Sequence, residues 1–385
     1  MTVDRLLLSR RRALIGGGAL TAAAMLARPA LAASRLDDLV AAQMAKASIP
    51  GLALGITQNG RVTATRVYGL ADVAHRRPVT RDSMFHIASV TKTVIALAFM
   101  RLVDQRRIAL DDAIAPHLDF TILGKGASAI TFRHLLMHVS GISDARYYDI
   151  DLRERGHDAR LPLEELLKAY LTKGGRYAGN GNLKSAPGTT WDYSNIGYGL
   201  LGHLSSRIAG RDLRREIDEH IFRPMGLRRI AWTIADTPAT LRVTPYDVVD
   251  GKVAATDPVG FPDWPAGMIR ASIGDLTRLV AIAANRGMAA EQRIVSAPSV
   301  AAMLDMQRPA RLPAWLSGQG LAWQQSALGD RPLANHWGGD PGVFTMAYVD
   351  PARRTGIALL SNLSATEESR AAMKTIAAAA MGLPG

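Results

Sequence analysis

The spacing of apolar positions predicts strands near both ends of the chain and helices between them. Apolar residues at helical spacing over 36–47 predict an opening helix. Two alternating segments then meet at Asn59-Gly60, the strongest short signal for a β-hairpin. Strand-like segments return over residues 320–328, 342–350 and 355–363, and an alanine-rich helix is expected to begin at Thr366. The two ends of the chain are therefore predicted to supply an antiparallel sheet with helices packed on it.

The middle of the chain has a different pattern. Helical spacing dominates there, in segments over 131–141, 163–171 and 195–210 that are separated by long polar loops. We therefore predict an α/β (α+β) fold. Residues 33–111 and 266–385 would form one α/β subdomain, an antiparallel sheet flanked by helices, and residues 112–265 a large helical insertion. A groove between two such parts is the default location for a binding site.

One predicted helix, over Val90–Val103, is apolar on nearly every face and should lie in the middle of the protein. Lys92 lies within it, and a charge on a buried helix is costly unless it is paired or functional. Ser89 stands three positions earlier, and positions i and i+3 share a face of a helix. Taken alone, the pair favours an ordinary helix start with Ser89 as the cap.

Composition narrows the classes of function. The 385-residue chain is 48% hydrophobic and 21% charged, which is typical of a globular protein. It has no cysteine, which excludes thiol catalysis and cysteine-ligated metal sites. The net charge of +12 comes from a basic leader and from scattered residues, without the aromatic–basic pattern of nucleic-acid recognition. We therefore expect no nucleic-acid partner.

Residues 1–32 are predicted to be an export signal. A basic start up to Arg12 precedes a weakly apolar stretch, and Ala30-Leu31-Ala32 fits a cleavage site. The apolar stretch is shorter than the ~20 residues of a membrane-spanning helix, so no stable membrane anchor is expected. Ser9-Arg10-Arg11 resembles a twin-arginine signal, although Ala13 stands where an aromatic residue is usual. A general secretory signal is the alternative, and either signal predicts a periplasmic or secreted protein.

Two later motifs change the interpretation of the serine and the lysine. WDYSNIGYG places Tyr193 and Asn195 two residues apart where a loop enters a helix, and HWGGDPG places His336 before Gly338 and Gly339. Each motif has an ordinary structural interpretation in isolation. Asn195 would cap the helix, the histidine would be a satisfied buried residue, and the glycines would serve a turn.

Together the three motifs resemble the serine β-lactamase and penicillin-binding-protein family, in its class C β-lactamase, D,D-peptidase and esterase branch. S-x-x-K, Y-x-N and a histidine–glycine motif occur in the order of that branch. The flanking stretches MFHIASVTK, ITFRHLLMHVSGISD, APGTTWDYSNIGYGLLG and DWPAGMIRASIGDLTRL are also similar to it, over residues 36 to about 363. No G-x-S-x-G elbow is present, which argues against an α/β-hydrolase.

The resemblance implies roles for the first two motifs. Ser89 would be the nucleophile that forms an acyl-enzyme. Lys92 and Tyr193 would share its proton transfers, and either of them could be the base, because coupled groups titrate as a pair. Asn195 would hold the substrate amide or Lys92. The resemblance implies no cofactor and no metal.

The third motif implies an oxyanion hole and contains a departure from the family. The backbone N–H groups of Ser89 and Gly339 would stabilise the oxyanion, with Gly338 beside them. His336 replaces a lysine, so a cation for a substrate carboxylate is missing or depends on pH. Trp337 is expected to add bulk beside it. Both changes favour an ester or a peptide-like amide over a β-lactam.

The leading hypothesis is therefore an exported serine hydrolase that works through an acyl-enzyme and acts on a small-molecule ester, a peptide-like amide or a β-lactam. The alternatives are an efficient class C-type β-lactamase and a wall-peptide-binding or β-lactam-binding protein that kept the fold and lost the chemistry. His134 and His138 stand four positions apart, but no glutamate lies between them in a metal-binding pattern. The family layout leads us to expect Tyr147 and Tyr148 in the cleft. No oligomeric state is predicted.

Overall fold

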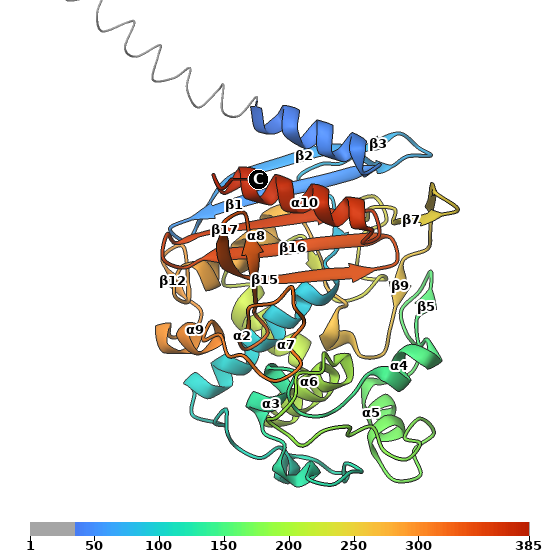
Figure 1. The fold of residues 1–385 in the computed structure, drawn as a ribbon, viewed down its shortest axis with the longest axis vertical. Helices are drawn as coiled ribbons and strands as arrows, with labels where there is room; N and C mark the ends of the chain where they lie inside the picture. The colour runs from blue at the N-terminus through green and yellow to red at the C-terminus, as the bar shows by residue number, and fades with distance from the viewer. Residues whose placement is uncertain (1–34, 385) are drawn as a thin grey trace, which may run out of the picture.

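Strands from both ends of the chain form one eight-stranded antiparallel sheet (Figure 1). The computed structural model describes residues 35–384, so the predicted export signal lies outside the described residues. The strand order is β13-β14-β15-β16-β17-β1-β2-β3, and the β17–β1 pair joins the C-terminal and N-terminal strands. The bounds are β1 Gly51–Gln58, β2 Arg61–Asp72, β3 Arg77–Pro78, β13 Gly318–Gln319, β14 Gln324–Leu328, β15 Arg331–Asp340, β16 Val343–Asp350 and β17 Thr355–Ser361. The predicted fold class is confirmed.

The turn between β1 and β2 has the conformation that its sequence predicts. Asn59 and Gly60 both adopt left-handed backbone angles, with φ of 51° and 77°. Two such residues form the hairpin turn whose twist matches that of the flanking strands. A Cβ on Gly60 would lie 2.1 Å from the Asn285 amide nitrogen, so the position also needs a residue without a side chain.

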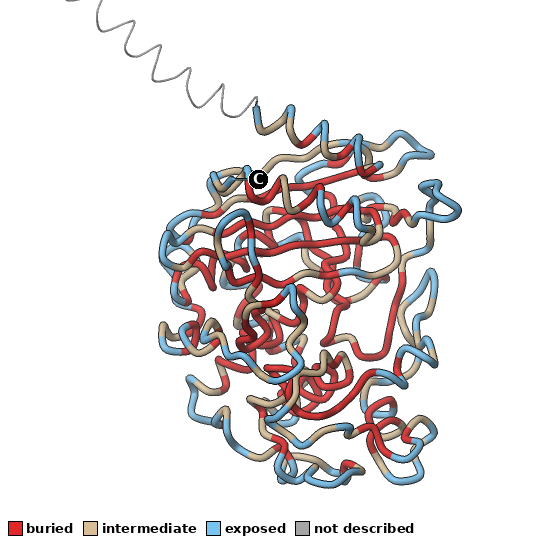
Figure 2. Tube along the Cα trace, in the orientation of Figure 1, coloured by how far each residue is buried: buried red, intermediate tan, exposed pale blue. Residues whose placement is uncertain are grey.

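The two faces of the sheet carry different helices. Leu52 and Leu54 of β1 face α10 (Glu367–Ala380) and the helix over residues 35–46, which confirms the predicted opening and closing helices. The opposite face carries α8 (Ile273–Ala284), which lies so close that a Cβ on Gly55 would be 1.9 Å from the Thr277 hydroxyl. Figure 2 shows that buried residues concentrate in the sheet and in the helices against it.

The helix α2 (Thr91–Asp104) lies between the sheet and a group of helices from the middle of the chain (Figure 1). Ten of its residues are buried, as its apolar pattern predicts. The middle helices are α3 Phe132–Leu136, α4 Ala145–Ile150, α5 Leu163–Leu171, α6 Asn195–Ala209 and α7 Leu213–Ile217, and α9 is Ala297–Met303. The largest apolar cluster runs across residues 111 and 266, so the predicted subdomain boundaries stay a prediction.

Short elements connect these layers. Their bounds are β4 Phe85–His86, β5 Glu154–Arg155, β6 Ile230–Ala231, β7 Tyr246–Val249, β8 Lys252–Ala255, β9 Val259–Gly260, β10 Arg270–Ala271, β11 Met288–Ala289 and β12 Gln292–Arg293, with the short helices η1 Ala88–Val90, η2 Ala115–His117, η3 Ala127–Ala129, η4 Asp218–Phe222 and η5 Trp264–Ala266. Within residues 35–384, no helix combines the length and the apolar character that crossing a bilayer requires.

The predicted strand over 320–328 is shorter than expected. Its first residues form a turn in which the Gly320 N–H donates to the Trp323 carbonyl oxygen. Ala322 has a φ of 64° in this turn, a conformation that L-residues other than asparagine and aspartate rarely adopt. The turn has a function in the site described below, because it directs the Ala322 carbonyl oxygen toward a histidine.

Candidate active site

Ser89 lies in η1, the short 3₁₀ turn that precedes α2, and does not cap a helix. Neither η1 nor α2 has a side-chain hydrogen bond at its N-terminus, so the capping interpretation of Ser89 is wrong. The preceding residue, Ala88, is fully buried and has a φ of 45°. Backbone strain of this kind persists only where the surrounding structure enforces it, and it is common at active sites.

Lys92 directs all three of its donors into the site. Its Nζ donates to Ser89 Oγ at 3.1 Å, to Asn195 Oδ1 at 2.8 Å and to the Ala266 carbonyl oxygen at 2.6 Å. The side chain is fully buried. Burial lowers the pKa of Lys92 to about 8, against the opposing effect of nearby carboxylates, of which Asp263 is the strongest. A proton acceptor beside the serine is therefore accessible near neutral pH.

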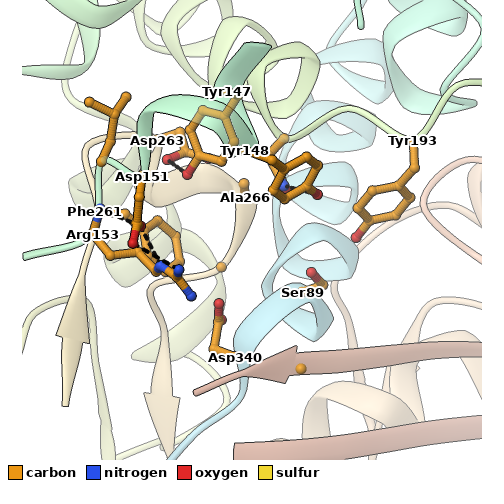
Figure 3. A pocket seen from close by; sticks show the side chains of 14 residues that line it. Ser89, Tyr147, Tyr148, Asp151, Arg153, Tyr193, Phe261, Asp263, Ala266 and Asp340 are labelled. Carbon is orange, nitrogen blue, oxygen red and sulfur yellow. Dashed lines mark hydrogen bonds and ion pairs between the residues drawn. The ribbon is translucent and has the colours of Figure 1, made fainter. Parts of the chain in front are cut away.

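Tyr193 approaches the serine from another side. Figure 3 shows its hydroxyl directed toward Ser89. The Lys92 Nζ lies 4.8 Å from the centre of the tyrosine ring. Burial raises the pKa of Tyr193, and the Ser89 hydroxyl acts against that effect. The phenol is therefore protonated at neutral pH in the unliganded protein.

His336 stands behind Tyr193 as a neutral side chain. Its Nδ1 donates to the Ala322 carbonyl oxygen at 2.6 Å, which leaves Nε2, at 3.5 Å from the Tyr193 hydroxyl, as an acceptor. Burial, helped by the charge of Lys92, lowers the pKa of His336 to about 3. The histidine therefore provides no cation for a substrate carboxylate at neutral pH.

The strand β15 passes directly beside the serine. A Cβ on Gly338 would lie 2.5 Å from the Ile87 carbonyl oxygen and 2.9 Å from the Ser89 nitrogen, so no other residue fits there without displacing backbone. Trp337 points to the opposite face, where its indole N–H donates to the Tyr348 hydroxyl at 3.0 Å. The expectation that Trp337 adds bulk beside the site is therefore wrong, because adjacent strand residues face opposite ways.

A cavity opens above these residues (Figure 3). Four of the seven predicted site residues line it, namely Ser89, Tyr193, Asn195 and Gly339. The other three, Lys92, His336 and Gly338, lie outside the lining. The expected position of Tyr147 and Tyr148 in the cleft is confirmed. The rest of the lining is Asp151, Leu152, Arg153, Phe261, Asp263, Ala266, Gly267 and Asp340.

Asp144 holds the Tyr193 loop and was not predicted. Its buried carboxylate accepts hydrogen bonds from Ser194 Oγ at 2.7 Å and from the backbone N–H groups of Asn195 and Ile196. Ser194 is the N-cap of α6, so Asn195 is not the cap and its side chain is available to Lys92. Burial raises the pKa of Asp144 to about 7, although these hydrogen bonds act against the effect.

His138 also belongs to the site, although the sequence pattern suggested it only as a possible metal ligand with His134. It has a φ of 58°, its ring stacks on Tyr193 with centroids 4.2 Å apart, and its Nδ1 accepts from the Ser194 N–H at 3.1 Å. His134 instead closes a capping box with Thr131 at the start of α3. No group of three or more potential metal ligands occurs in the part of the chain that the structure describes.

Comparison with known proteins identifies the family. The Beta-lactamase family matches residues 36–381. Esterase EstB from Burkholderia gladioli is 27% identical over 367 residues, which cover 86% of this chain and 90% of the esterase. Penicillin-binding protein 4 from Amycolatopsis lactamdurans is 28% identical over 332 residues, which cover 82% of this chain and 81% of that protein.

A solved structure shares the fold. The octameric penicillin-binding protein homologue from Pyrococcus abyssi superposes with a TM-score of 0.76 at 23% identity, over 91% of this chain and 78% of the homologue. The match to the family covers nearly all the described residues and includes each of the three motifs. The chain therefore belongs to the Beta-lactamase family, and it is a serine hydrolase of the β-lactamase and penicillin-binding-protein fold.

Proposed function

We propose that this protein hydrolyses esters or peptide-like amides through an acyl-enzyme on Ser89. The observation that carries the proposal is the 3.1 Å hydrogen bond between Ser89 Oγ and the Nζ of a fully buried Lys92, at the edge of a cavity. A serine becomes a nucleophile when an adjacent group can take its proton. A lysine whose pKa is about 8 is such a group near neutral pH.

In the proposed mechanism, neutral Lys92 takes the Ser89 proton as the hydroxyl oxygen attacks the carbonyl carbon. Tyr193 is a neutral phenol, so it donates its proton to the leaving group and is reprotonated by the Lys92 ammonium. The acceptor nitrogen of His336 orients the phenol. Asn195 holds Lys92 through its Oδ1, and its amide nitrogen donates to the hydroxyl of Tyr148, another residue of the cavity lining. Hydrolysis of the acyl-enzyme then repeats the same proton transfers with water as the nucleophile.

The oxyanion hole would be formed by the backbone N–H groups of Ser89 and Gly339. Two preorganised donors aimed at a developing oxyanion commonly contribute more to the rate than any other single effect. The close approach of β15 to η1 at Gly338 supports this assignment, because it fixes the neighbouring Gly339 in the cavity lining.

The chemistry of the third motif favours esters and amides over β-lactams. The substrates of an efficient class C-type β-lactamase carry a carboxylate, and a neutral His336 offers no charge to bind it. The similarity to an esterase over 86% of this chain supports esters as substrates. A catalytically silent binding protein is disfavoured, because Ser89, Lys92, Tyr193 and Asn195 are all present and close together.

Labelling with a fluorophosphonate tests the nucleophile. Wild type should carry one label, on Ser89, and Ser89→Ala should carry none. Ser128→Ala, which changes an exposed serine in η3, is the matched control and should label like wild type. A turnover panel of a p-nitrophenyl ester, a D-Ala-D-Ala peptide and a chromogenic cephalosporin then ranks the substrate classes. Equal labelling of wild type and Ser89→Ala, or turnover of the cephalosporin far above the other two, would contradict the proposal.

We also propose that the protein is exported to the periplasm or secreted. The support is the basic start, the short apolar stretch and the Ala30-Leu31-Ala32 site in residues 1–32. Fractionation of cells that express the full chain tests the location. Replacement of Arg10 and Arg11 by lysine separates the two routes, because only a twin-arginine signal depends on that pair.

A further inference from the structure

The cavity beside Ser89 is rich in carboxylates, which the proposed reaction does not use. Four charged side chains line it, namely Asp151, Arg153, Asp263 and Asp340. Asp151 and Arg153 neutralise each other, because the guanidinium donates to both carboxylate oxygens, at 2.5 and 2.9 Å (Figure 3). Asp263 and Asp340 therefore remain as the charges that a substrate would meet.

Asp263 has an oxygen without a partner. Its side chain is fully buried, and Oδ1 accepts from the Tyr147 hydroxyl at 2.7 Å. Its other oxygen, Oδ2, is buried and has no hydrogen-bond partner among residues 35–384. A buried acceptor left without a donor is destabilising, because it has lost its hydrogen bonds to water. A donor supplied by a ligand in the cavity would remove that cost.

Asp340 points into the same cavity, between Arg153 and Ser89 (Figure 3). Its side chain is 21% exposed, and its carboxylate makes no hydrogen bond with any residue that the structure describes. The basic atom nearest to it is His86 Nε2 at 3.9 Å, but that nitrogen donates to the Gly267 carbonyl oxygen at 2.6 Å. Burial lowers the pKa of His86 to about 3, so the histidine is neutral and does not pair with Asp340.

The other cations nearby are already engaged. Lys92 uses its donors on Ser89, Asn195 and the Ala266 carbonyl oxygen. Arg270 is fully buried and donates to two backbone carbonyl oxygens, those of Met268 and Val259. These cations stabilise the ionised form of Asp340 without contacting it. Burial has the larger, opposite effect and raises the pKa of Asp340 to about 7.

The register of β15 indicates which part of a substrate would meet Asp340. His336, Gly338 and Asp340 alternate along the strand and therefore share a face, spaced about 7 Å apart. His336 contacts the Tyr193 hydroxyl, which would protonate the leaving group, and Gly338 contacts Ser89. Asp340 lies beyond the serine on the side away from Tyr193, which is the side of the acyl group.

We propose that Asp340 and Asp263 bind an ammonium group on the acyl part of the substrate, so that the protein prefers amino-acid esters or amides with a free amino group. This preference rests on the hydrolase function proposed above. An ammonium nitrogen can donate to the unpartnered Asp263 Oδ2 and to Asp340 together, and it neutralises charge where a carboxylate would be repelled. The competing occupant is a substrate carboxylate bound by Arg153.

Three methyl esters that differ at one group test the preference. Methyl alaninate, in both enantiomers, carries the ammonium, methyl propionate lacks it, and monomethyl succinate carries a carboxylate. The measured quantity is the ratio of kcat/KM for alaninate to that for propionate at pH 7, in wild type and in variants. Because each ratio is divided by the wild-type ratio, the intrinsic reactivity of the esters cancels. Loss of the one charge-assisted hydrogen bond to Asp340 predicts that Asp340→Asn lowers this ratio about tenfold or more, which corresponds to ~1.4 kcal/mol.

Matched variants separate the possible outcomes. Asp263→Asn should also lower the ratio, and Asp149→Asn, an exposed residue outside the cavity lining, should keep it. If Asp340→Asn lowers kcat/KM equally for methyl alaninate and methyl propionate, Asp340 only supports the strand and the proposal is wrong. A preference for the succinate ester that Arg153→Gln abolishes would also overturn it. Fluorophosphonate labelling of the same preparations separates the hydrolase proposal from the ammonium-subsite proposal. Wild type that labels on Ser89 but shows no preference for methyl alaninate refutes only the subsite. Wild type that does not label refutes both proposals.

Discussion

If Lys92 takes the proton of Ser89 as proposed, the pH dependence of Ser89 acylation should report the protonation state of Lys92. Burial lowers the pKa of Lys92 from 10.5 to about 8, although Asp263, Asp144 and Asp340 oppose the shift. About one lysine in ten is then neutral at pH 7, compared with about one in 2,500 at an ordinary pKa. Since only the neutral amine can accept the serine proton, we expect the rate to rise about tenfold per pH unit in acid and to level off above about pH 9.

The assay is the second-order rate constant for labelling by a fluorophosphonate between about pH 6 and about pH 10. Lys92→Arg keeps a positive charge but cannot release a proton in this range, so we expect the rate to fall by about 10²–10⁴ and the midpoint to disappear. Tyr193→Phe should slow the turnover of substrates but leave the midpoint near 8, because burial keeps the phenol protonated.

One carboxylate variant and its control test whether a nearby carboxylate raises the pKa of Lys92. Asp263 favours the ammonium form of Lys92, so Asp263→Asn should lower the pKa of the lysine further and move the midpoint to lower pH. The exposed Asp149→Asn is the control and should not move it. The reasoning fails if the wild-type midpoint lies above about pH 10, or if Tyr193→Phe moves the midpoint and Lys92→Arg retains it.

Three further substitutions separate the parts of the site. Gly338→Ala places a methyl group against the backbone of Ser89, so we expect a folded protein by circular dichroism that no longer labels; normal labelling would contradict the close approach. Asp144→Asn turns an acceptor of three hydrogen bonds partly into a donor, so urea unfolding should show a loss of about 1–3 kcal/mol, and an unchanged midpoint would argue against its role in the loop. Trp337→Ala should lower the free energy of unfolding by about 3 kcal/mol and leave the ratio of propionate to succinate turnover unchanged, because its ring lies on the face of β15 away from the cavity. A changed ratio would restore Trp337 as a residue that shapes the substrate site.

Features that depend on neighbours in sequence could be predicted. The i, i+3 spacing of Ser89 and Lys92 placed the two side chains on one face, and they lie in hydrogen-bond contact. The cost of a lysine on an all-round apolar helix indicated a function for it before any fold was known. The hairpin at Asn59-Gly60 was equally local, because the two residues fix their own turn.

Features that depend on contacts between distant segments could not be predicted. Asp144 meets Ser194 across 50 positions, and Lys92 meets Ala266 across 174. No periodicity encodes such pairs. The prediction for Trp337 was wrong for a related reason, since the face of a strand residue is set by register and a shift of one position reverses it. Asp340, three positions later, faces the cavity by the same alternation.

The pairing of β17 with β1 determines when, during synthesis, the hydrolase can first act. Ser89 and Lys92 leave the ribosome about 250 residues before Gly338, and β1 has no partner on that side until β17 has been made. Pairing between strands so far apart in sequence forms slowly, after the loop between them has closed. A nascent chain therefore carries Ser89 and Lys92 without the strand that completes the proposed site, and we expect it to be inactive until its last strands have folded.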